Sequence, residues 1–142
     1  MRHLLLGLLI AACVASAAGF GYLVSARSGQ ASEGAALYAA NCASCHGARL
    51  EGQAEWMKRL PNGRLPAPPH DESGHTWHHS DKQLFIIVKN GLAAIAPGYE
   101  SDMPTFGGVL TDVQIMAVLG YIKSTWPERA QAYQAARSSA DP

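Results

Sequence analysis

The chain alternates between segments with a helical pattern of apolar residues and long segments rich in glycine and proline. Residues 35–40 form the first helical segment, because alanine favours a helix and Leu37 and Tyr38 give it an apolar side. Ser32 or Gly34 is the expected N-cap of this helix.

Residues 80–91 and 111–126 predict two further helices, each of which begins with a residue pair at capping-box spacing. The pairs are Ser80 with Gln83 and Thr111 with Gln114. Asn90 and Gly91 end the former helix, and Pro127 follows the latter. The apolar side chains expected in the core are Leu84, Phe85, Ile87, Val88, Ile115, Leu119 and Ile122, with Met116 as core filling.

The pattern predicts helices and no strand. Residues 47–80 and 92–110 are expected to be loops, and loops of this length in a compact domain are normally functional or enclose a ligand. We expect four parts along the chain: a targeting segment at 1–26, a linker at 27–33, a domain at 34–127, and a polar C-terminal tail at 128–142. The tail is expected to be helical at first and then frayed.

Residues 4–24 carry no charged side chain and provide the ~20 residues that a membrane-spanning helix needs. Their length favours an uncleaved anchor over a cleaved signal peptide, whose apolar core has about 7–15 residues. The small residues that end at Ala26 are typical of a cleavage site, so a cleaved signal peptide stays open as a second interpretation. Lipid attachment at Cys13 is a third. All three predict that the rest of the chain is exported, and the favoured one anchors it in the inner membrane.

Composition adds two constraints. The 142 residues include eleven acidic and eleven basic side chains, so the sequence predicts no nucleic-acid partner. Of the three cysteines, only Cys42 and Cys45 lie in the exported domain. A single close pair does not form a disulfide framework, so another role is expected for it.

Residues 42–46 read Cys-Ala-Ser-Cys-His at the end of the first predicted helix. A thioredoxin-like dithiol lies instead at the start of a helix that follows a strand, and a structural zinc site needs about four ligands. The favoured interpretation is attachment of a c-type haem, in which the thiols of Cys42 and Cys45 form thioethers with the haem vinyl groups. His46 is then the expected proximal ligand of the iron.

Met103 is the expected second axial ligand, because it lies in a turn-rich loop just before the last predicted helix. Pro104 restricts Met103 to an extended backbone, which suits a side chain directed inward. Met57 follows the cysteine motif too closely, and Met116 belongs to the last helix. A gap-filling role for Met103, and a histidine in its place at the iron, stay open.

One loop contains four histidines, namely His70, His75, His78 and His79, together with Trp77. One interpretation is a second metal site, for copper or zinc. The favoured interpretation is that these side chains cover the haem edge, bond to its propionates or face solvent.

The segments GAALYAANCASCHG and DMPTFGGVLTDVQIMAVLGYIKSTWP resemble the two ends of a class I monohaem cytochrome c domain, over residues 31–127. The resemblance implies a small all-α domain wrapped around one covalent haem c, in which the first and last helices cross. Gly34 or Ala35 is then expected to face Gly120 and Tyr121. The implied haem-binding residues are Cys42 and Cys45 as thioethers, with His46 and Met103 as axial ligands.

The function that this resemblance implies is electron transfer rather than catalysis, since two protein ligands leave no open position on the iron. A thioether ligand raises the reduction potential of such an iron. The expected partners are redox proteins of a respiratory or periplasmic chain and the membrane, through residues 4–24. Two alternatives stay open: a haem subunit of a dehydrogenase or oxidase complex, and a copper-handling protein that uses the histidine loop.

Overall fold

The computed structural model describes residues 29 and 31–141, and this part of the chain consists of helices and loops without any strand. The all-α prediction is therefore confirmed for it. The predicted targeting segment at residues 1–26 lies outside the described residues. Within the described residues, every helix is too short or too polar to span a membrane.

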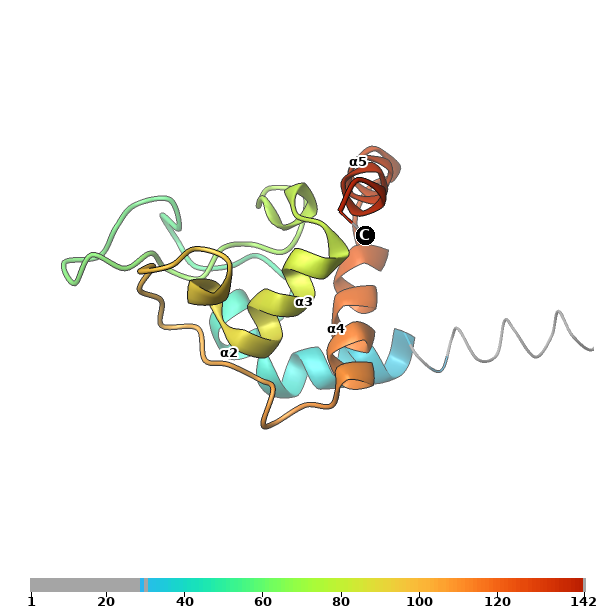
Figure 1. The fold of residues 1–142 in the computed structure, drawn as a ribbon, viewed down its shortest axis with the longest axis horizontal. Coiled ribbons are helices and arrows are strands. Elements are labelled where there is room, and N and C mark those ends of the chain that lie inside the picture. The colour runs from blue at the N-terminus through green and yellow to red at the C-terminus, as the bar shows by residue number, and fades with distance from the viewer. Residues whose placement is uncertain (1–28, 30, 142) are drawn as a thin grey trace, which may run out of the picture.

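The first described helix covers residues 29 and 31–41, and six further helical elements follow it in the described part of the chain (Figure 1). Two of them, η1 and η2, are single 3-10 turns within the long loops. The elements are α2 (Ala43–His46), η1 (Thr76–His78), α3 (Asp81–Asn90), η2 (Leu92–Ala94), α4 (Asp112–Ser124) and α5 (Glu128–Ser139).

The first described helix begins earlier than the sequence predicts. Ser32 and Gly34 lie inside it rather than at its cap, and residues 31–33 of the expected linker are helical. Ala31 and Glu33 are good helix formers with exposed side chains. Polar composition alone therefore does not distinguish an exposed helical turn from a linker.

The predicted caps of α3 and α4 are confirmed. Ser80 Oγ accepts a hydrogen bond from the backbone N–H of Gln83 at 3.1 Å. Thr111 and Gln114 form a complete capping box, in which each side chain bonds to the backbone N–H of the other residue. Gly91, with φ +88°, ends α3.

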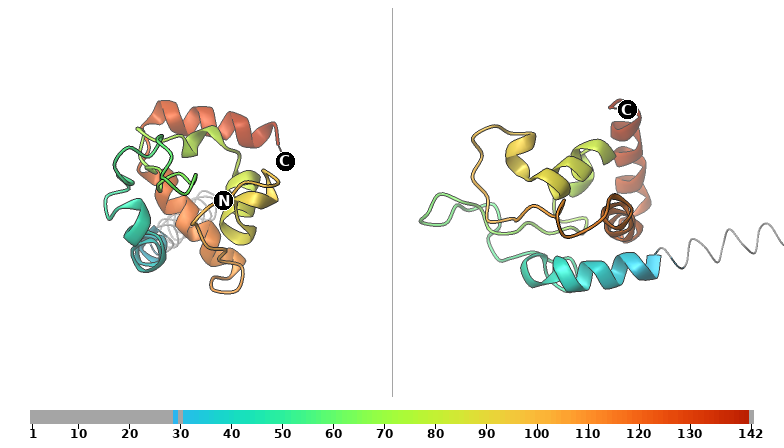
Figure 2. Two further views of the ribbon diagram at one scale, coloured as in Figure 1. Left: turned by 90° about the vertical axis from the view of Figure 1, so that its left-hand side faces the viewer. Right: turned by 60° about the horizontal axis from the view of Figure 1, so that its bottom comes forward.

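The first described helix crosses α4, and Gly34 lies at the contact (Figure 2). A Cβ atom at Gly34 would lie 2.2 Å from the carbonyl oxygen of Ala117 and 3.0 Å from Cβ of Tyr121. Tyr38, one turn later, is fully buried, and its ring centroid lies 5.5 Å from that of Tyr121. The expected crossing is thus present at Gly34 and Tyr121, whereas the space around Gly120 is open.

The hydrophobic core lies between these two helices, α3 and the start of α5. The predicted core residues Leu84, Ile115, Leu119 and Ile122 are buried, and Phe85, Ile87 and Val88 are partly buried. Met116 is 48% exposed, so the prediction that it fills the core is wrong. It shares an outward face of α4 with Val113, because α4 packs only one stripe of side chains against the core.

The helix α5 extends to Ser139, further than the fraying tail that the sequence predicts. Gln134 is 1% exposed, and its Nε2 donates to Asp81 Oδ1 at 2.8 Å and to the carbonyl of His79 at 3.3 Å. The ring of Tyr133 packs edge-on against Trp77, with centroids 5.4 Å apart. These contacts stabilise a helix that would be marginal in isolation at this length.

Candidate functional site

The cysteine motif forms one tight turn that continues the first described helix. The backbone N–H of His46 donates to the carbonyl of Cys42 at 2.9 Å. Gly47, with φ +83°, ends α2, and a Cβ atom there would meet the Glu51 carboxylate at 2.2 Å. The turn therefore holds Cys42, Cys45 and His46 within a single helical turn, as attachment to one edge of a macrocycle requires.

The two thiols are free, with Cys42 half-buried and Cys45 exposed. Burial, and then the charge of the neighbouring Cys45, raises the pKa of the Cys42 thiol to about 11. The pair also lies at the C-terminal end of a helical segment, where the helix dipole disfavours a thiolate. Redox dithiols need a lowered thiol pKa, so this arrangement argues against disulfide exchange.

His46 is buried, with 7% of its surface exposed, and its Nδ1 lies 2.9 Å from the carbonyl oxygen of Pro68. Burial lowers the pKa of the imidazole, and the hydrogen bond to Pro68 offsets only part of this effect. The ring is therefore neutral at pH 7. Because a carbonyl oxygen can only accept, Nδ1 carries the proton and Nε2 keeps its lone pair. This is the protonation state that a metal-binding histidine requires.

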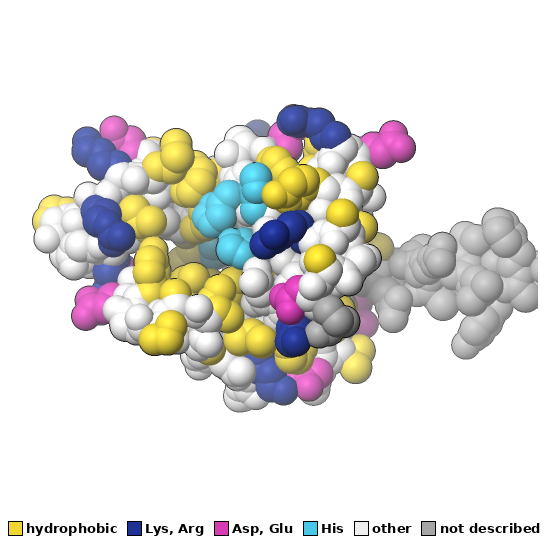
Figure 3. All heavy atoms as spheres, turned by 45° about the horizontal axis from the view of Figure 1, so that its top comes forward, with side chains coloured by type: hydrophobic (Ala, Val, Ile, Leu, Met, Phe, Trp, Pro, Cys, Tyr) yellow, Lys and Arg dark blue, Asp and Glu magenta, His cyan; other side chains and the backbone are white. Residues whose placement is uncertain are grey.

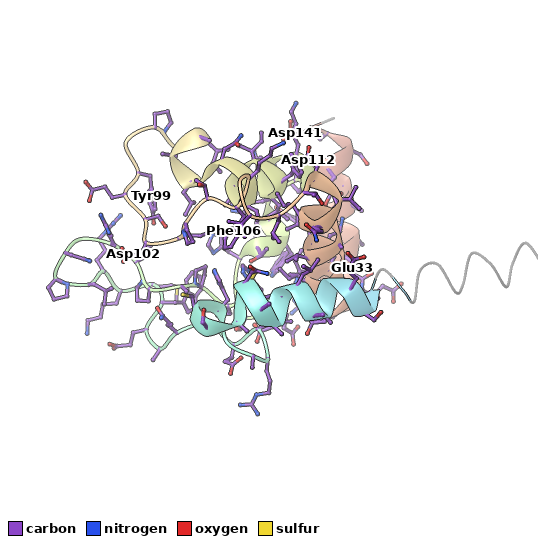
Figure 4. The ribbon with its side chains drawn as sticks, turned by 90° about the horizontal axis from the view of Figure 1, so that it is seen from below. Glu33, Tyr99, Asp102, Phe106, Asp112 and Asp141 are labelled. Atoms are coloured by element: carbon purple, nitrogen blue, oxygen red, sulfur yellow. The ribbon has the colours of Figure 1, made fainter. Side chains whose placement is uncertain are left out.

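Met103 lies in the loop between Tyr99 and Phe106 (Figure 4). Its side chain is half-buried and packs against the hydrophobic core, and its N–H donates to Ser101 Oγ at 3.1 Å. Met57 is 76% exposed, and Met116 is also exposed. Among the methionines that the structure describes, Met103 is thus the one that packs against the core.

The histidines of the middle loop do not converge on one point. Two of them stack on other rings, in the pairs His70 with His46 and His75 with Trp56, and His78 lies tilted against Trp77. No group of three or more His, Cys, Asp or Glu side chains in the described part of the chain is arranged to hold a metal ion. The second metal site therefore gains no support from the structure.

Arg64 joins the two long loops beside Met103, a contact that the sequence does not predict. Its Nη1 donates to the carboxylate of Asp102, and its Nε lies 3.8 Å from Glu100 Oε2. These loops extend to the same side of the molecule, away from α5 (Figures 1 and 2). Arg64 and Asp102 are 38 residues apart, so no local pattern connects them.

A hollow on one face of the molecule is bordered by hydrophobic and histidine side chains (Figure 3). Trp77 Nε1 is buried without any hydrogen-bond partner among the described residues. Two thiols, a neutral imidazole and a half-buried thioether are groups of the kind that hold a covalently attached haem.

Comparison with known proteins gives one match. The sequence profile of the family described as cytochrome c oxidase, cbb3-type, subunit III matches residues 29–122. The matched region contains the cysteine motif, Met103 and most of α4, and it ends before α5. No curated protein and no solved structure matches the chain.

Proposed function

This chain belongs to the family of c-type cytochrome domains described as cytochrome c oxidase, cbb3-type, subunit III, and on that premise we propose that it transfers electrons through one haem c with His46 and Met103 as axial ligands. Family membership bears out the resemblance to a cytochrome c domain. It implies a covalently bound haem c and a role as an electron carrier rather than a catalytic enzyme. The number of haems, the axial ligands and the location are our proposal.

The observation that carries the proposal is the state of His46. The ring is buried and neutral, and Nδ1–H donates a hydrogen bond to the carbonyl oxygen of Pro68 at 2.9 Å. Nε2 of His46, the residue after Cys45, therefore keeps a lone pair with which it can bind a metal. A histidine that served only the core would use both ring nitrogens in hydrogen bonds or lie against apolar side chains without this fixed tautomer.

Bound haem supplies an iron that alternates between the ferrous and ferric states. The thioether of Met103 is a soft ligand that favours the ferrous state and so raises the reduction potential. Met103 is half-buried and packs against the hydrophobic core, which limits the access of water to its side chain. Residues Cys42 and Cys45 keep the macrocycle attached, which an exported protein needs because released haem would be lost.

An absorption spectrum of the purified wild-type protein tests this proposal. We expect one haem per chain that resists extraction from the denatured protein, and a weak near-infrared band typical of methionine–iron ligation. Met103→Ala should abolish that band and lower the reduction potential. Met116→Ala is the matched control, because Met116 is exposed on α4 and should leave both unchanged. An unchanged band in Met103→Ala would refute the ligand assignment.

We also propose that the domain lies in the periplasm and is held at the membrane by residues 4–24. Cytochrome c domains are typically exported, and the uncharged segment is long enough to serve as an anchor. The test compares the full chain with a form in which residues 1–26 are replaced by a cleavable export signal. The full chain should sediment with membranes and the shortened form should not. Equal release of both forms would contradict the anchor.

A second candidate is a haem subunit that transfers electrons only within a larger complex. The description of the matched family, subunit III of a cbb3-type cytochrome c oxidase, favours this alternative. Affinity purification of the full chain from its own membranes distinguishes the two. A catalytic subunit retained in a fixed ratio supports the complex, whereas a chain recovered alone and still reducible supports the free carrier.

A further inference from the structure

The ring of His70 lies parallel to the ring of His46. Their centroids are 4.0 Å apart and their planes differ by 22°. Such a face-to-face contact at van der Waals distance covers one side of the imidazole that we assign to the iron. The rings of Tyr38 and His70 form a T-shaped pair, with centroids 6.3 Å apart and planes at 73°. His70 thus contacts both the axial imidazole and a buried tyrosine.

His70 is fixed through both its side chain and its backbone. Its Nδ1 lies 2.8 Å from Oγ1 of Thr76, which is itself buried. Its N–H donates to the carbonyl of Leu50 at 2.8 Å, and its carbonyl accepts from Trp126 Nε1 at 2.7 Å. Thr76, six residues further along the chain, holds the ring, and Trp126, 56 residues further along, holds the backbone.

The contact between His70 and His46 is one of shape and dispersion. Dispersion between two rings at this separation is attractive and orientation-dependent.

We propose that His70 is a positioning residue that sets the orientation of the His46 imidazole plane over the haem. This inference rests on the proposed function, in which His46 binds the iron. The hydrogen bond to Pro68 holds one atom of the ring and leaves the ring able to rock about that atom. Contact with a parallel, immobile ring removes this rotation. Groups outside the coordination sphere orient metal-binding histidines in this way.

The orientation of an axial imidazole has a spectroscopic signature. In low-spin ferric haem, it determines which iron orbital holds the unpaired electron, and so determines the anisotropy of the electron paramagnetic resonance spectrum. A single orientation gives one sharp set of g values. Several orientations give broadened or multiple sets. This readout does not respond to a general loss of stability, so it separates positioning from a structural role.

The experiment compares three variants of the haem-loaded protein in the ferric state. His70→Phe keeps a flat ring against His46 but loses the bond to Thr76, so its g values should change less than those of His70→Leu. His70→Leu removes the flat face, and its largest g value should shift or broaden. His78→Leu is the matched control, because His78 is exposed and packs on Trp77 instead of His46, and its spectrum should be unchanged.

A His70→Leu spectrum that superimposes on the wild type overturns the inference, and so does an equal change in His70→Phe and His70→Leu. If His70→Leu fails to fold, the same spectrum of Thr76→Val tests the inference instead. It removes the partner of Nδ1 while leaving the ring, so partial broadening supports the inference and an unchanged spectrum refutes it. A wild-type protein with haem and methionine ligation but insensitive to His70 refutes only this inference. A wild-type protein without covalent haem refutes the proposed function as well.

Discussion

Replacement of Gly34 by alanine tests the helix crossing on which the fold depends. The new Cβ would lie 2.2 Å from the carbonyl oxygen and 2.8 Å from the carbonyl carbon of Ala117. Both are backbone atoms of α4, and a rotamer change cannot move them aside. The two helices must therefore separate by roughly 1 Å to restore a normal contact distance of about 3.5 Å.

The expected magnitude follows from two opposing terms. Overpacking of a well-packed contact destabilises by about 1–3 kcal/mol, and the backbone clash at Gly34 places it at the upper end. Alanine in place of glycine within a helix stabilises by about 1 kcal/mol. The net loss in the free energy of unfolding is then about 2 kcal/mol. For a domain of this size, the melting temperature falls by about 8 °C.

Gly120→Ala is the matched control on the opposite helix. No atom lies within 4 Å of the Cβ position of Gly120, so only the helix-propensity term applies there. The melting temperature of Gly120→Ala should rise by about 2–4 °C. Thermal unfolding followed by far-ultraviolet circular dichroism measures both variants. If Gly34→Ala is as stable as the wild type, or more so, the close approach of the two helices is wrong.

Two further predictions concern charged groups. Burial alone would raise the pKa of Asp81, but hydrogen bonds from Lys123 and from α5 outweigh it and lower the pKa. The Asp81 carboxylate therefore stabilises the fold above the pKa of the unfolded state, about 3.9. This stabilisation is lost as the pH falls through the lower pKa of the folded state. Asp81→Asn should be less stable by about 1 kcal/mol at pH 7, a small value because the carboxylate is partly solvated, and the difference in denaturant unfolding should shrink as the pH falls through the lowered pKa of the folded state. A constant difference at all pH values would contradict this assignment. Arg64→Gln removes the ion pair that joins the two loops beside Met103. As the pH is raised, the near-infrared band should therefore be lost at a lower pH than in the wild type. High salt should reduce this difference between the variant and the wild type. Arg129→Gln, which removes an exposed ion pair elsewhere, should have no such effect.

The helical elements could be predicted from the sequence because their signals are local. Ser80 with Gln83, Thr111 with Gln114, and Gly91 act within a few residues of where they stand, and the structure contains each of these caps. The stripe of core residues along α4 follows from the period of the helix in the same way. The cysteine motif and its histidine are likewise local, since their chemistry requires a fixed spacing.

Other features could not be predicted because they depend on residues far apart in sequence. Polar composition predicts a fraying end for α5, but Gln134 is buried against Asp81, which lies 53 residues earlier. The exposure of the Met116 side chain depends on which side of α4 packs against the neighbouring helices. Arg64 and His70 carry no motif at all, and their roles follow only from the loops and rings that the fold places beside them.

The position of α5 has a consequence for the order of events during synthesis. Its polar contacts with the residues that follow η1 join positions 53 to 61 residues apart, from Gln134 with Asp81 to Asp141 with Ser80. A chain made from its N-terminus therefore presents Cys42 and Cys45 long before the last helix can close this part of the fold. Attachment of the cofactor can therefore precede the docking of α5. Because α5 lies outside the family-matched region, its docking is a step separate from attachment.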